Sequence, residues 1–238
     1  MLLGVLLWCQ RFRPGPSARN LALPLCALSG GPSVNTVLIN VTRPADGIVA
    51  LTLNRDEKRN ALSEELLVAL EGELERALID ASSVLLTGAG SAFSAGADLS
   101  AGDPAGIYPS LKRVVDMIRG AEKAVVAYVN GPAIGAGAML AGACDIRVVA
   151  PSARFAIPVA KMGVPVPPGL AAELAGLVGG ARARTMLMTG MPLNAAVAVD
   201  SGFAALRGMY DDAVEVAKVC AAGNPATIAS IKSTYFSE

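Results

Sequence analysis

Two segments rich in glycine and alanine are the first candidates for chemistry in this 238-residue sequence. They are GAGSAFSAGADL over residues 88–99 and NGPAIGAGAML over residues 130–140, and each begins where an apolar run ends. Residues this small let a ligand approach the backbone, and free amides at the start of a helix attract negative charge. For either segment alone, close packing of a helix against a sheet is an equally open explanation.

The residue types that are missing restrict the chemistry further. The sequence contains no histidine, and no ligand spacing relates its four cysteines, Cys9, Cys26, Cys144 and Cys220. Catalysis by a Ser-His-Asp or Cys-His arrangement is therefore excluded, and zinc sites are disfavoured. We expect no bound metal, and we expect the cysteines to be reduced and to serve as small hydrophobic residues.

Neither glycine-rich segment matches a common nucleotide or nucleophile motif. Leu140 occupies the position at which a dinucleotide-binding fingerprint needs a glycine, and the sequence has no GK[ST] phosphate-binding motif. Ser94 lacks the glycine two residues earlier that a nucleophile elbow requires. Both segments need another explanation.

Composition indicates a globular chain that recruits no partner through bulk charge. Hydrophobic residues make up 53% of the sequence, and 20 basic residues balance 20 acidic ones. This balance argues against a nucleic-acid partner and against a membrane surface.

The leader over residues 1–33 differs from the rest, because it is basic and contains no acidic residue. Its apolar run at residues 1–8 is too short to cross a bilayer. We interpret the leader as disordered or as the product of an upstream start codon, and an organellar transit peptide is the alternative. The expected location is cytoplasmic, or mitochondrial if the alternative holds.

Hydrophobic patterning predicts an α/β fold. Apolar runs predict strands at residues 37–41, 47–54, 83–88, 124–131 and 145–151, with a hairpin turn at 44–47. Ser63, followed by Glu64 and Glu65, predicts the N-cap of an amphipathic helix of about 17 residues. Further helices are expected at 169–178, 181–189, 194–201, 211–222 and 225–234. Strands that alternate with helices imply a largely parallel sheet covered on both faces.

In combination, the two glycine-rich segments resemble the crotonase superfamily, also called the enoyl-CoA hydratase/isomerase family. The resemblance rests on SAFSAGADL and VNGPAIGAGAMLAGACDIRVVAP, preceded by LNRDEKRNALS and followed by FAIPVAKMGVPVPPG, and it covers residues 34–235. It implies a crotonase-like ββα spiral core over residues 34–190 and C-terminal helices over 191–238. Family members usually continue further, so we expect this helical region to be shortened. The resemblance also implies a homotrimer or hexamer.

The same resemblance implies an acyl-CoA thioester as ligand and no cofactor beyond its CoA moiety. Two backbone amides of the family bind the thioester oxygen, and they correspond to Ala97 and Ala136 of this sequence. Small side chains suit such a site, because the chemistry uses the backbone and bulk would obstruct it. The residues expected to bind the CoA moiety are Arg55, Lys58, Arg59, Ala61, Ala95, Asp98 and Leu99, and the three cations among them suit phosphate.

The sequence departs from the family at two positions that matter for catalysis. Met139 and Val159 align with the two glutamates that hydratases use to activate water, and neither side chain can transfer a proton. We therefore expect a protein that binds acyl-CoA thioesters without hydrating them efficiently. One alternative is an active hydratase or isomerase with a relocated acid or base, and another is a structural subunit that binds no CoA. The candidates for a relocated group, each also explained as a turn, loop or solvated residue, are Asp98, Asp103, Tyr108, Lys161 and Glu173.

Overall fold

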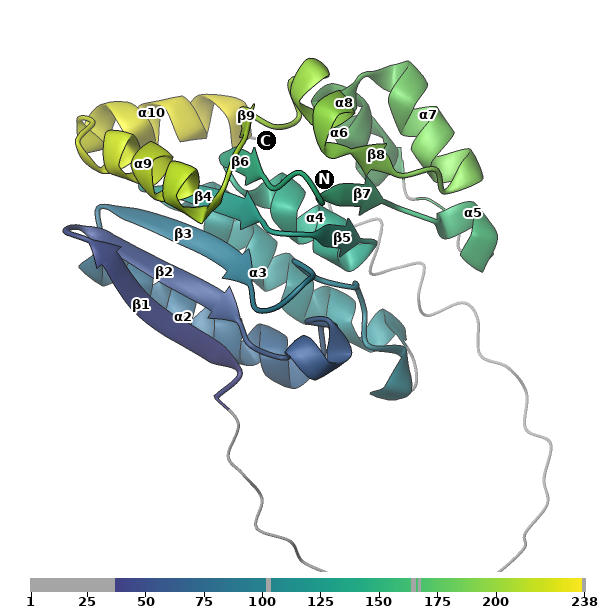
Figure 1. Ribbon diagram of the computed structural model, residues 1–238, viewed down its shortest axis with the longest axis horizontal. Helices are drawn as coiled ribbons and strands as arrows, with labels where there is room; N and C mark the ends of the chain where they lie inside the picture. Colours follow the sequence, from purple (N-terminus) through teal and green to yellow (C-terminus); the bar gives the residue numbers. More distant parts are fainter. Residues whose placement is uncertain (1–36, 102–103, 164–165, 167, 237–238) are drawn as a thin grey trace, which may run out of the picture.

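The computed structural model describes residues 37–101, 104–163, 166 and 168–236. Four of the sequence-based expectations fall outside these residues, namely those for the leader over 1–33, for Cys9, for Cys26 and for Asp103. The described chain forms a large sheet, a smaller sheet and helices on both sides of the large one (Figure 1). The predicted α/β class is therefore confirmed.

The large sheet contains every strand that the hydrophobic runs predict. Its order is β1 (Ile39–Ala45), β2 (Ile48–Leu53), β3 (Ser83–Gly88), β4 (Ala124–Val129), β6 (Ile146–Val149) and β9 (Leu206–Arg207). β1 and β2 form the predicted antiparallel hairpin, whose turn places Gly47 at a φ of 70°. All other neighbouring strands are parallel, which confirms the expectation of a largely parallel sheet.

A second sheet of very short strands runs beside the first. It consists of β5 (Pro132–Ile134), β7 (Arg154–Ala156) and β8 (Leu193–Asn194), in that order. Two isolated β-bridges, Leu62–Ala97 and Ser94–Ala133, pair further short extended segments in the same way. Ala133 belongs to β5, and the other three residues come earlier in the chain. The chain thus repeats one unit, which is a strand of the large sheet, a short extended segment and a helix. This repeat is the expected ββα spiral.

The helices follow the predicted pattern and add three that the patterning did not specify, α3, α4 and α5. In chain order they are α2 (Glu64–Asp80), α3 (Tyr108–Gly120), α4 (Ala136–Ala143), α5 (Val159–Met162), α6 (Pro168–Val178), α7 (Gly180–Thr189), α8 (Ala195–Asp200), α9 (Tyr210–Ala221) and α10 (Pro225–Phe236). Three short 3-10 turns lie between them, η1 (Asp56–Lys58), η2 (Leu99–Ala101) and η3 (Pro104–Ile107). Ser63 Oγ accepts a hydrogen bond from Leu66 N at 3.2 Å, so the predicted cap and the 17-residue length of α2 are both confirmed.

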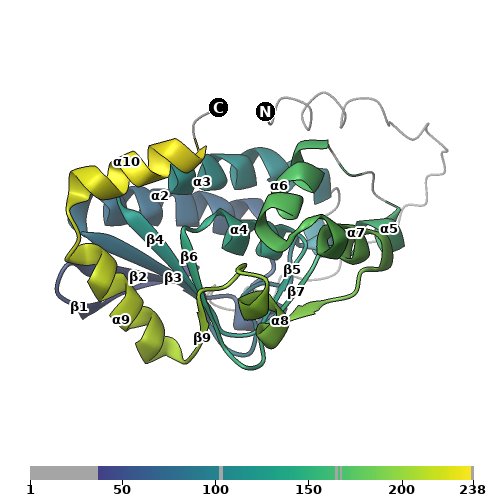
Figure 2. The ribbon, with the colours of Figure 1, turned by 90° about the horizontal axis from the view of Figure 1, so that it is seen from above.

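Helices cover both faces of the large sheet, as the continuous apolar strands predict. Along β4, Val125, Ala127 and Val129 pack into a core beneath α2, α3 and α4, whereas Val126 and Tyr128 pack against α9. This alternation follows from the two-residue period of a strand. Viewed from above, α2 and α3 lie on one side of the strands and α9 lies on the other (Figure 2).

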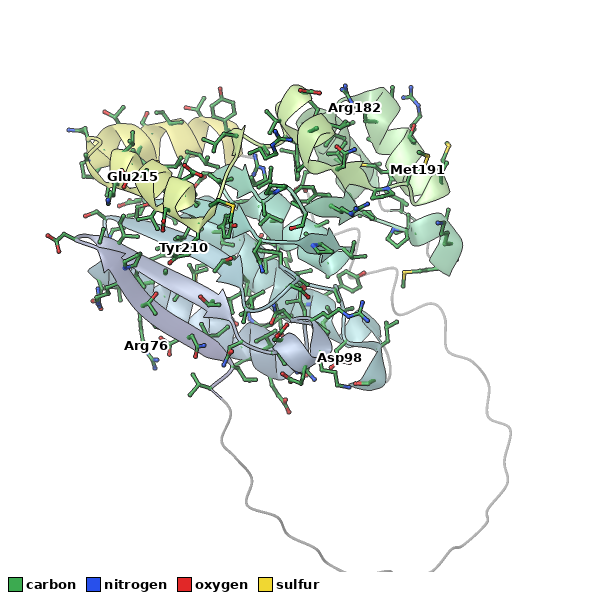
Figure 3. The ribbon with its side chains drawn as sticks, viewed as in Figure 1. Arg76, Asp98, Arg182, Met191, Tyr210 and Glu215 are labelled. Atoms are coloured by element: carbon green, nitrogen blue, oxygen red, sulfur yellow. The ribbon has the colours of Figure 1, made fainter. Side chains whose placement is uncertain are left out.

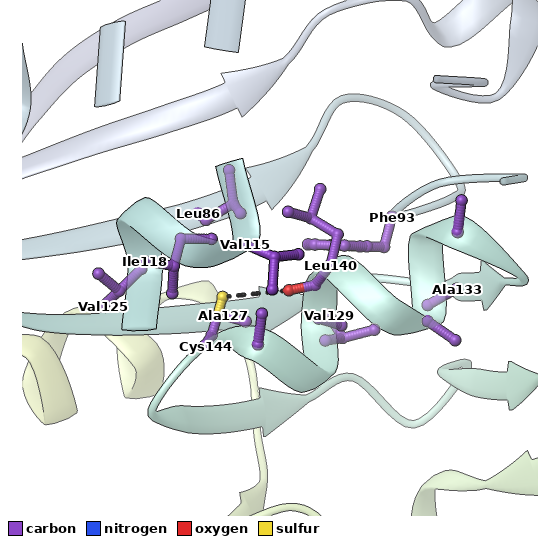
Figure 4. Packing of buried hydrophobic residues seen from close by; sticks show 14 of the residues in the cluster. Leu86, Phe93, Val115, Ile118, Val125, Ala127, Val129, Ala133, Leu140 and Cys144 are labelled. Atoms are coloured by element: carbon purple, nitrogen blue, oxygen red, sulfur yellow. Dashed lines mark hydrogen bonds between the residues drawn. The ribbon is translucent and has the colours of Figure 1, made fainter. Parts of the chain in front are cut away.

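The larger core shows how tightly α4 is enclosed. Leu140 and Cys144 lie among side chains of α3 and β4, including Val115 and Ile118 (Figure 4). Burial raises the pKa of the Cys144 thiol to about 12, so this residue behaves as a small hydrophobe. Cys144 and Cys220 are both free, in agreement with the expected reduced state of the cysteines that the structure describes.

A buried lysine fastens α10 to the sheet. Lys232 Nζ donates hydrogen bonds to Ile118 O at 2.8 Å, Lys123 O at 3.0 Å and Asp145 Oδ2 at 2.7 Å. The same carboxylate oxygen accepts a hydrogen bond from Val125 N at 2.7 Å. All three donors of the ammonium group therefore have partners, which offsets the cost of burying its charge.

Candidate functional site

Three loops meet where neighbouring parallel strands end. The first site loop (residues 54–63) follows β2, the second (89–98) follows β3, and the third (130–136) follows β4. Figure 3 shows Asp98, from the second loop, at the end of the molecule toward which these strands run. Ligands of open α/β sheets bind at this end, beyond the carboxyl ends of the strands.

Backbone hydrogen bonds join the three site loops into one unit. Leu62 N donates to Gly96 O at 2.7 Å, and Asp98 N donates to Leu62 O at 2.9 Å, so the first loop pairs with both neighbours of Ala97. On the other side of the second loop, Ile134 N donates to Ser94 O at 3.0 Å. The second loop is thus held between the first and the third.

This arrangement brings the two predicted amide donors to the same place. Gly96 has a φ of +93°, and a Cβ at that position would lie 2.6 Å from Ile134 O and 3.6 Å from Ala136 N. Ala97, next along the second loop, is half-buried, and Ala136, the first residue of α4, is buried. Neither amide donates a hydrogen bond to any residue that the structure describes. Both amides thus have a hydrogen bond to donate to a carbonyl oxygen.

Asn60 is a buried residue of the site whose role the sequence did not reveal. Its Nδ2 atom donates to Ala89 O at 2.9 Å and to Ala92 O at 2.8 Å, and its Oδ1 atom accepts from Arg55 N at 2.9 Å. The backbone of Asn60 has a positive φ of 54°, which asparagine tolerates better than most residues. In the sequence, Asn60 stood out only as part of the stretch RNAL, which resembles the family. That resemblance gave no indication that the side chain of Asn60 would hold the loops together.

Arg55 and Asp98, both expected to bind CoA, form an ion pair instead of pointing into solvent. Arg55 Nη1 lies 2.7 Å from Asp98 Oδ2 and also donates to Ala61 O at 3.0 Å. Asp98 Oδ1 accepts hydrogen bonds from Ser100 Oγ at 2.6 Å and from Ser100 N at 2.9 Å. These hydrogen bonds and the guanidinium of Arg55 hold the pKa of Asp98 well below its usual range. A carboxylate with a lowered pKa is a weaker base, so these contacts disfavour Asp98 as the relocated base.

All of the remaining predicted CoA ligands except Ala61 are exposed, on the same loops or directly next to them. Lys58 and Arg59 are exposed, and neither side chain forms an ion pair with an acidic residue in the described part of the chain. Ala95 N donates to Arg59 O at 2.9 Å, which places these cations next to the second site loop. Leu99 is 61% exposed, whereas Ala61 is buried. Binding of CoA by these residues stays a prediction.

Met139 and Val159 both pack against the larger core while remaining partly accessible. Met139, on α4, lines a cavity of about 20 Å³ together with Ile157, Glu173 and Leu174. A volume of this size has room for about one water molecule. Val159 begins α5, with its amide bonded to Ile157 O at 2.9 Å.

The candidates for a relocated acid or base lie in different surroundings. Tyr108 begins α3 and is half-buried, so the interpretation of this residue as part of a mobile loop is wrong. The interpretation missed the helix because its first residues follow a glycine-rich stretch. Lys161 is exposed on α5 and lies against Gly190, at the end of α7. Glu173 forms an ion pair with Arg119 and faces the cavity beside Met139.

Two negative findings apply to the residues that the structure describes. They contain no cluster of histidine, cysteine, aspartate or glutamate side chains arranged to hold a metal ion. No helix within the same ranges combines the length and the apolar character needed to cross a membrane.

The fold and the paired site loops define a crotonase-type α/β protein, and comparison with known proteins gives the same result. Residues 43–237 match the enoyl-CoA hydratase/isomerase family, so the chain belongs to this family. It is 40% identical over 185 residues to a protein of Mycobacterium leprae named "Probable enoyl-CoA hydratase", with 74% of this chain and 73% of the relative covered.

Solved structures of two different enzymes are similar to the whole fold. An enoyl-CoA hydratase from Thermoplasma volcanium has a TM-score of 0.77 and 29% identity, covering 85% of this chain and 86% of that one. A monofunctional enoyl CoA isomerase from M. smegmatis has a TM-score of 0.72 and 29% identity, covering 85% and 93%. Because a hydratase and an isomerase resemble the chain almost equally, the fold alone does not select an activity.

Proposed function

We propose that this protein binds acyl-CoA thioesters and holds the thioester oxygen between the amides of Ala97 and Ala136. One observation carries the proposal, namely that two amides without partners among the described residues lie on loops joined by the hydrogen bond from Ile134 N to Ser94 O. Backbone donors aimed at a carbonyl oxygen stabilise negative charge on it. Lys58 and Arg59 are the exposed cations assigned to the phosphates of CoA.

The bound thioester is not hydrated efficiently in this proposal. Met139 and Val159 give the site an apolar wall at the positions assigned to the two family glutamates. Loss of one general acid or base typically costs ~10²–10⁴ in rate, and here both are replaced. The protein then acts as a carrier, a sensor or a delivery protein for acyl-CoA. A trimeric or hexameric assembly, a cytoplasmic location and the absence of any cofactor beyond CoA belong to the same proposal.

A second candidate function is supported by the position of Glu173. Its side chain lines the cavity that Met139 also lines, so it shares that cavity with the first assigned glutamate position. Because Glu173 is paired with Arg119, we expect it to serve as a base only if this ion pair opens. An enoyl-CoA isomerase would need such a single base.

Binding and turnover measured on the same preparation test these functions. Calorimetry with octanoyl-CoA and with free CoA should show tighter binding of the acylated ligand. Crotonyl-CoA mixed with the protein should keep its conjugated-thioester absorbance, which hydration would remove, and 3-hexenoyl-CoA should not acquire such absorbance, which isomerisation would create. Turnover that Glu173→Gln abolishes would establish the enzyme and refute the carrier. An absence of binding by either ligand would leave the purely structural role.

A further inference from the structure

We propose that Ser94 is the positioning residue that sets the geometry between the Ala97 and Ala136 amides. The proposal rests on the thioester site described above and assigns a role to a residue that is neither a nucleophile nor a ligand. Ser94 is completely buried in the second site loop, so its hydroxyl group cannot contact a substrate directly. Its function must therefore be carried by the groups that it holds.

The hydroxyl of Ser94 fixes the turn that presents Ala97. Ser94 Oγ accepts a hydrogen bond from Gly96 N at 3.2 Å and donates one to Asn60 O at 2.8 Å. The first bond closes the turn immediately before Ala97. The second anchors that turn to the first site loop, where Asn60 is itself held by Ala89 and Ala92.

The backbone and Cβ of Ser94 fix the segment that presents Ala136. Ser94 N donates to Pro132 O at 3.1 Å, and Ser94 O accepts from Ile134 N at 3.0 Å, two residues before Ala136. Gly137, in the first turn of α4, approaches Ser94 so closely that a Cβ there would lie 2.7 Å from Ser94 Cβ and 2.9 Å from Ser94 Oγ. Ser94 thus contacts the supports of both donors, one through its hydroxyl group and the other through its backbone and Cβ.

Polarisation of the bound thioester carbonyl distinguishes a positioning role of Ser94 from a contribution to protein stability alone. Two backbone donors at the correct spacing polarise the thioester carbonyl, and a misplaced donor does so less. The probe is octanoyl-CoA labelled with carbon-13 at the thioester carbonyl, whose resonance is compared between the free and bound states. Affinity for free CoA is measured in parallel, because CoA binding does not use the two amides.

We expect Ser94→Ala to lose most of the downfield carbonyl shift that the wild type shows, and to bind octanoyl-CoA about 3- to 10-fold more weakly, the effect of one hydrogen bond. Its affinity for free CoA should stay within about 2-fold of wild type, since ~0.4 kcal/mol corresponds to that factor. Ser91→Ala is the matched control. Ser91 is exposed in the same loop, and its side chain makes no hydrogen bond to a described residue, so this variant should behave as wild type.

A second variant keeps the test decisive if Ser94→Ala does not fold. Gly137→Ala retains the hydroxyl and introduces the better helix former, but its methyl group pushes Ser94 and α4 apart. We expect it, too, to lose the carbonyl shift with free-CoA affinity preserved.

The outcomes distinguish a failure of the positioning role of Ser94 from a failure of the proposed thioester site on which it rests. A wild-type protein that binds octanoyl-CoA without any carbonyl shift would overturn the thioester site itself. A wild-type shift that folded Ser94→Ala retains in full would overturn the positioning role alone. Where Ser94→Ala is unfolded, a full shift in Gly137→Ala would do the same.

Discussion

Replacing Asp98 with asparagine tests how firmly the first and second site loops are joined. The side chains of Asp98 and Arg55 are 6% and 18% exposed, and their charged atoms are 2.7 Å apart. Removing one partner of such a buried pair costs about 3–5 kcal/mol, because the other charge stays buried. Asparagine keeps an acceptor for Ser100, and Arg55 keeps its bond to Ala61 O. We therefore expect a loss of about 3 kcal/mol, the lower end of that range.

Urea unfolding at neutral pH measures this loss directly. The midpoint should fall while the slope of free energy against urea stays unchanged. The control is Asp80→Asn, which breaks an ion pair with Arg43 whose side chains are 55% and 61% exposed and 3.2 Å apart. An exposed pair of this kind contributes less than about 1 kcal/mol.

The pH dependence provides an independent check on Asp98. Its pKa in the folded protein lies below the ordinary value, so the folded state binds this proton less readily than the unfolded state. The stabilisation is then fully present above about pH 5 and declines as the pH falls through about 4 and below. The difference in stability between wild type and Asp98→Asn should shrink over that interval. A difference below about 1 kcal/mol at neutral pH, or one that grows on acidification, would refute the ion-pair argument.

Two further changes test other parts of the structure. Met139→Glu combined with Val159→Glu should introduce hydratase activity toward crotonyl-CoA, followed by the loss of its absorbance, and no gain in the folded double variant would contradict the positional assignment. Lys232→Met should lower the free energy of unfolding by about 3–5 kcal/mol, because it strands the carboxylate of Asp145, whereas Lys218→Met on the exposed face of α9 should cost less than about 1 kcal/mol in the same urea titration.

Patterning predicted those elements whose signals are local. The leucines of α2 recur at helical spacing behind a serine cap, and Leu66, Leu70 and Leu74 are indeed buried. Every residue of β3 and β4 is buried, because both faces of the sheet are covered. In such segments the local sequence and the tertiary environment favour the same structure.

The short strands of the second sheet gave no such signal. β5, β7 and β8 contain two or three residues each, too few for a two-residue period to be recognised. They are extended because neighbouring turns of the spiral supply hydrogen-bond partners, a tertiary effect that no local window contains.

The sequence indicated which loops form the candidate site but not the contacts within it, and ligand binding by these loops stays a prediction. Its glycine-rich segments predicted backbone chemistry at Ala97 and Ala136, and the structure brings these residues to one place. The family resemblance and its positive charge suggested that Arg55 was a phosphate ligand, and the structure adds an ion pair with Asp98 of another loop that the sequence did not reveal. The charged residues can be read from the sequence, but which of them form ion pairs across loops depends on the fold.

The hydrogen bonds of Lys232 also have a consequence for the order in which the chain completes its fold. They connect α10 to residues that precede it by 87 and 114 positions. At a synthesis rate of about 5–20 residues per second, roughly 4–17 s separate the appearance of Asp145 from that of Lys232 on the ribosome. Throughout this interval the carboxylate at the edge of the nascent sheet lacks its counter-charge. α10 therefore joins the fold only after the segments that Lys232 contacts have been synthesised.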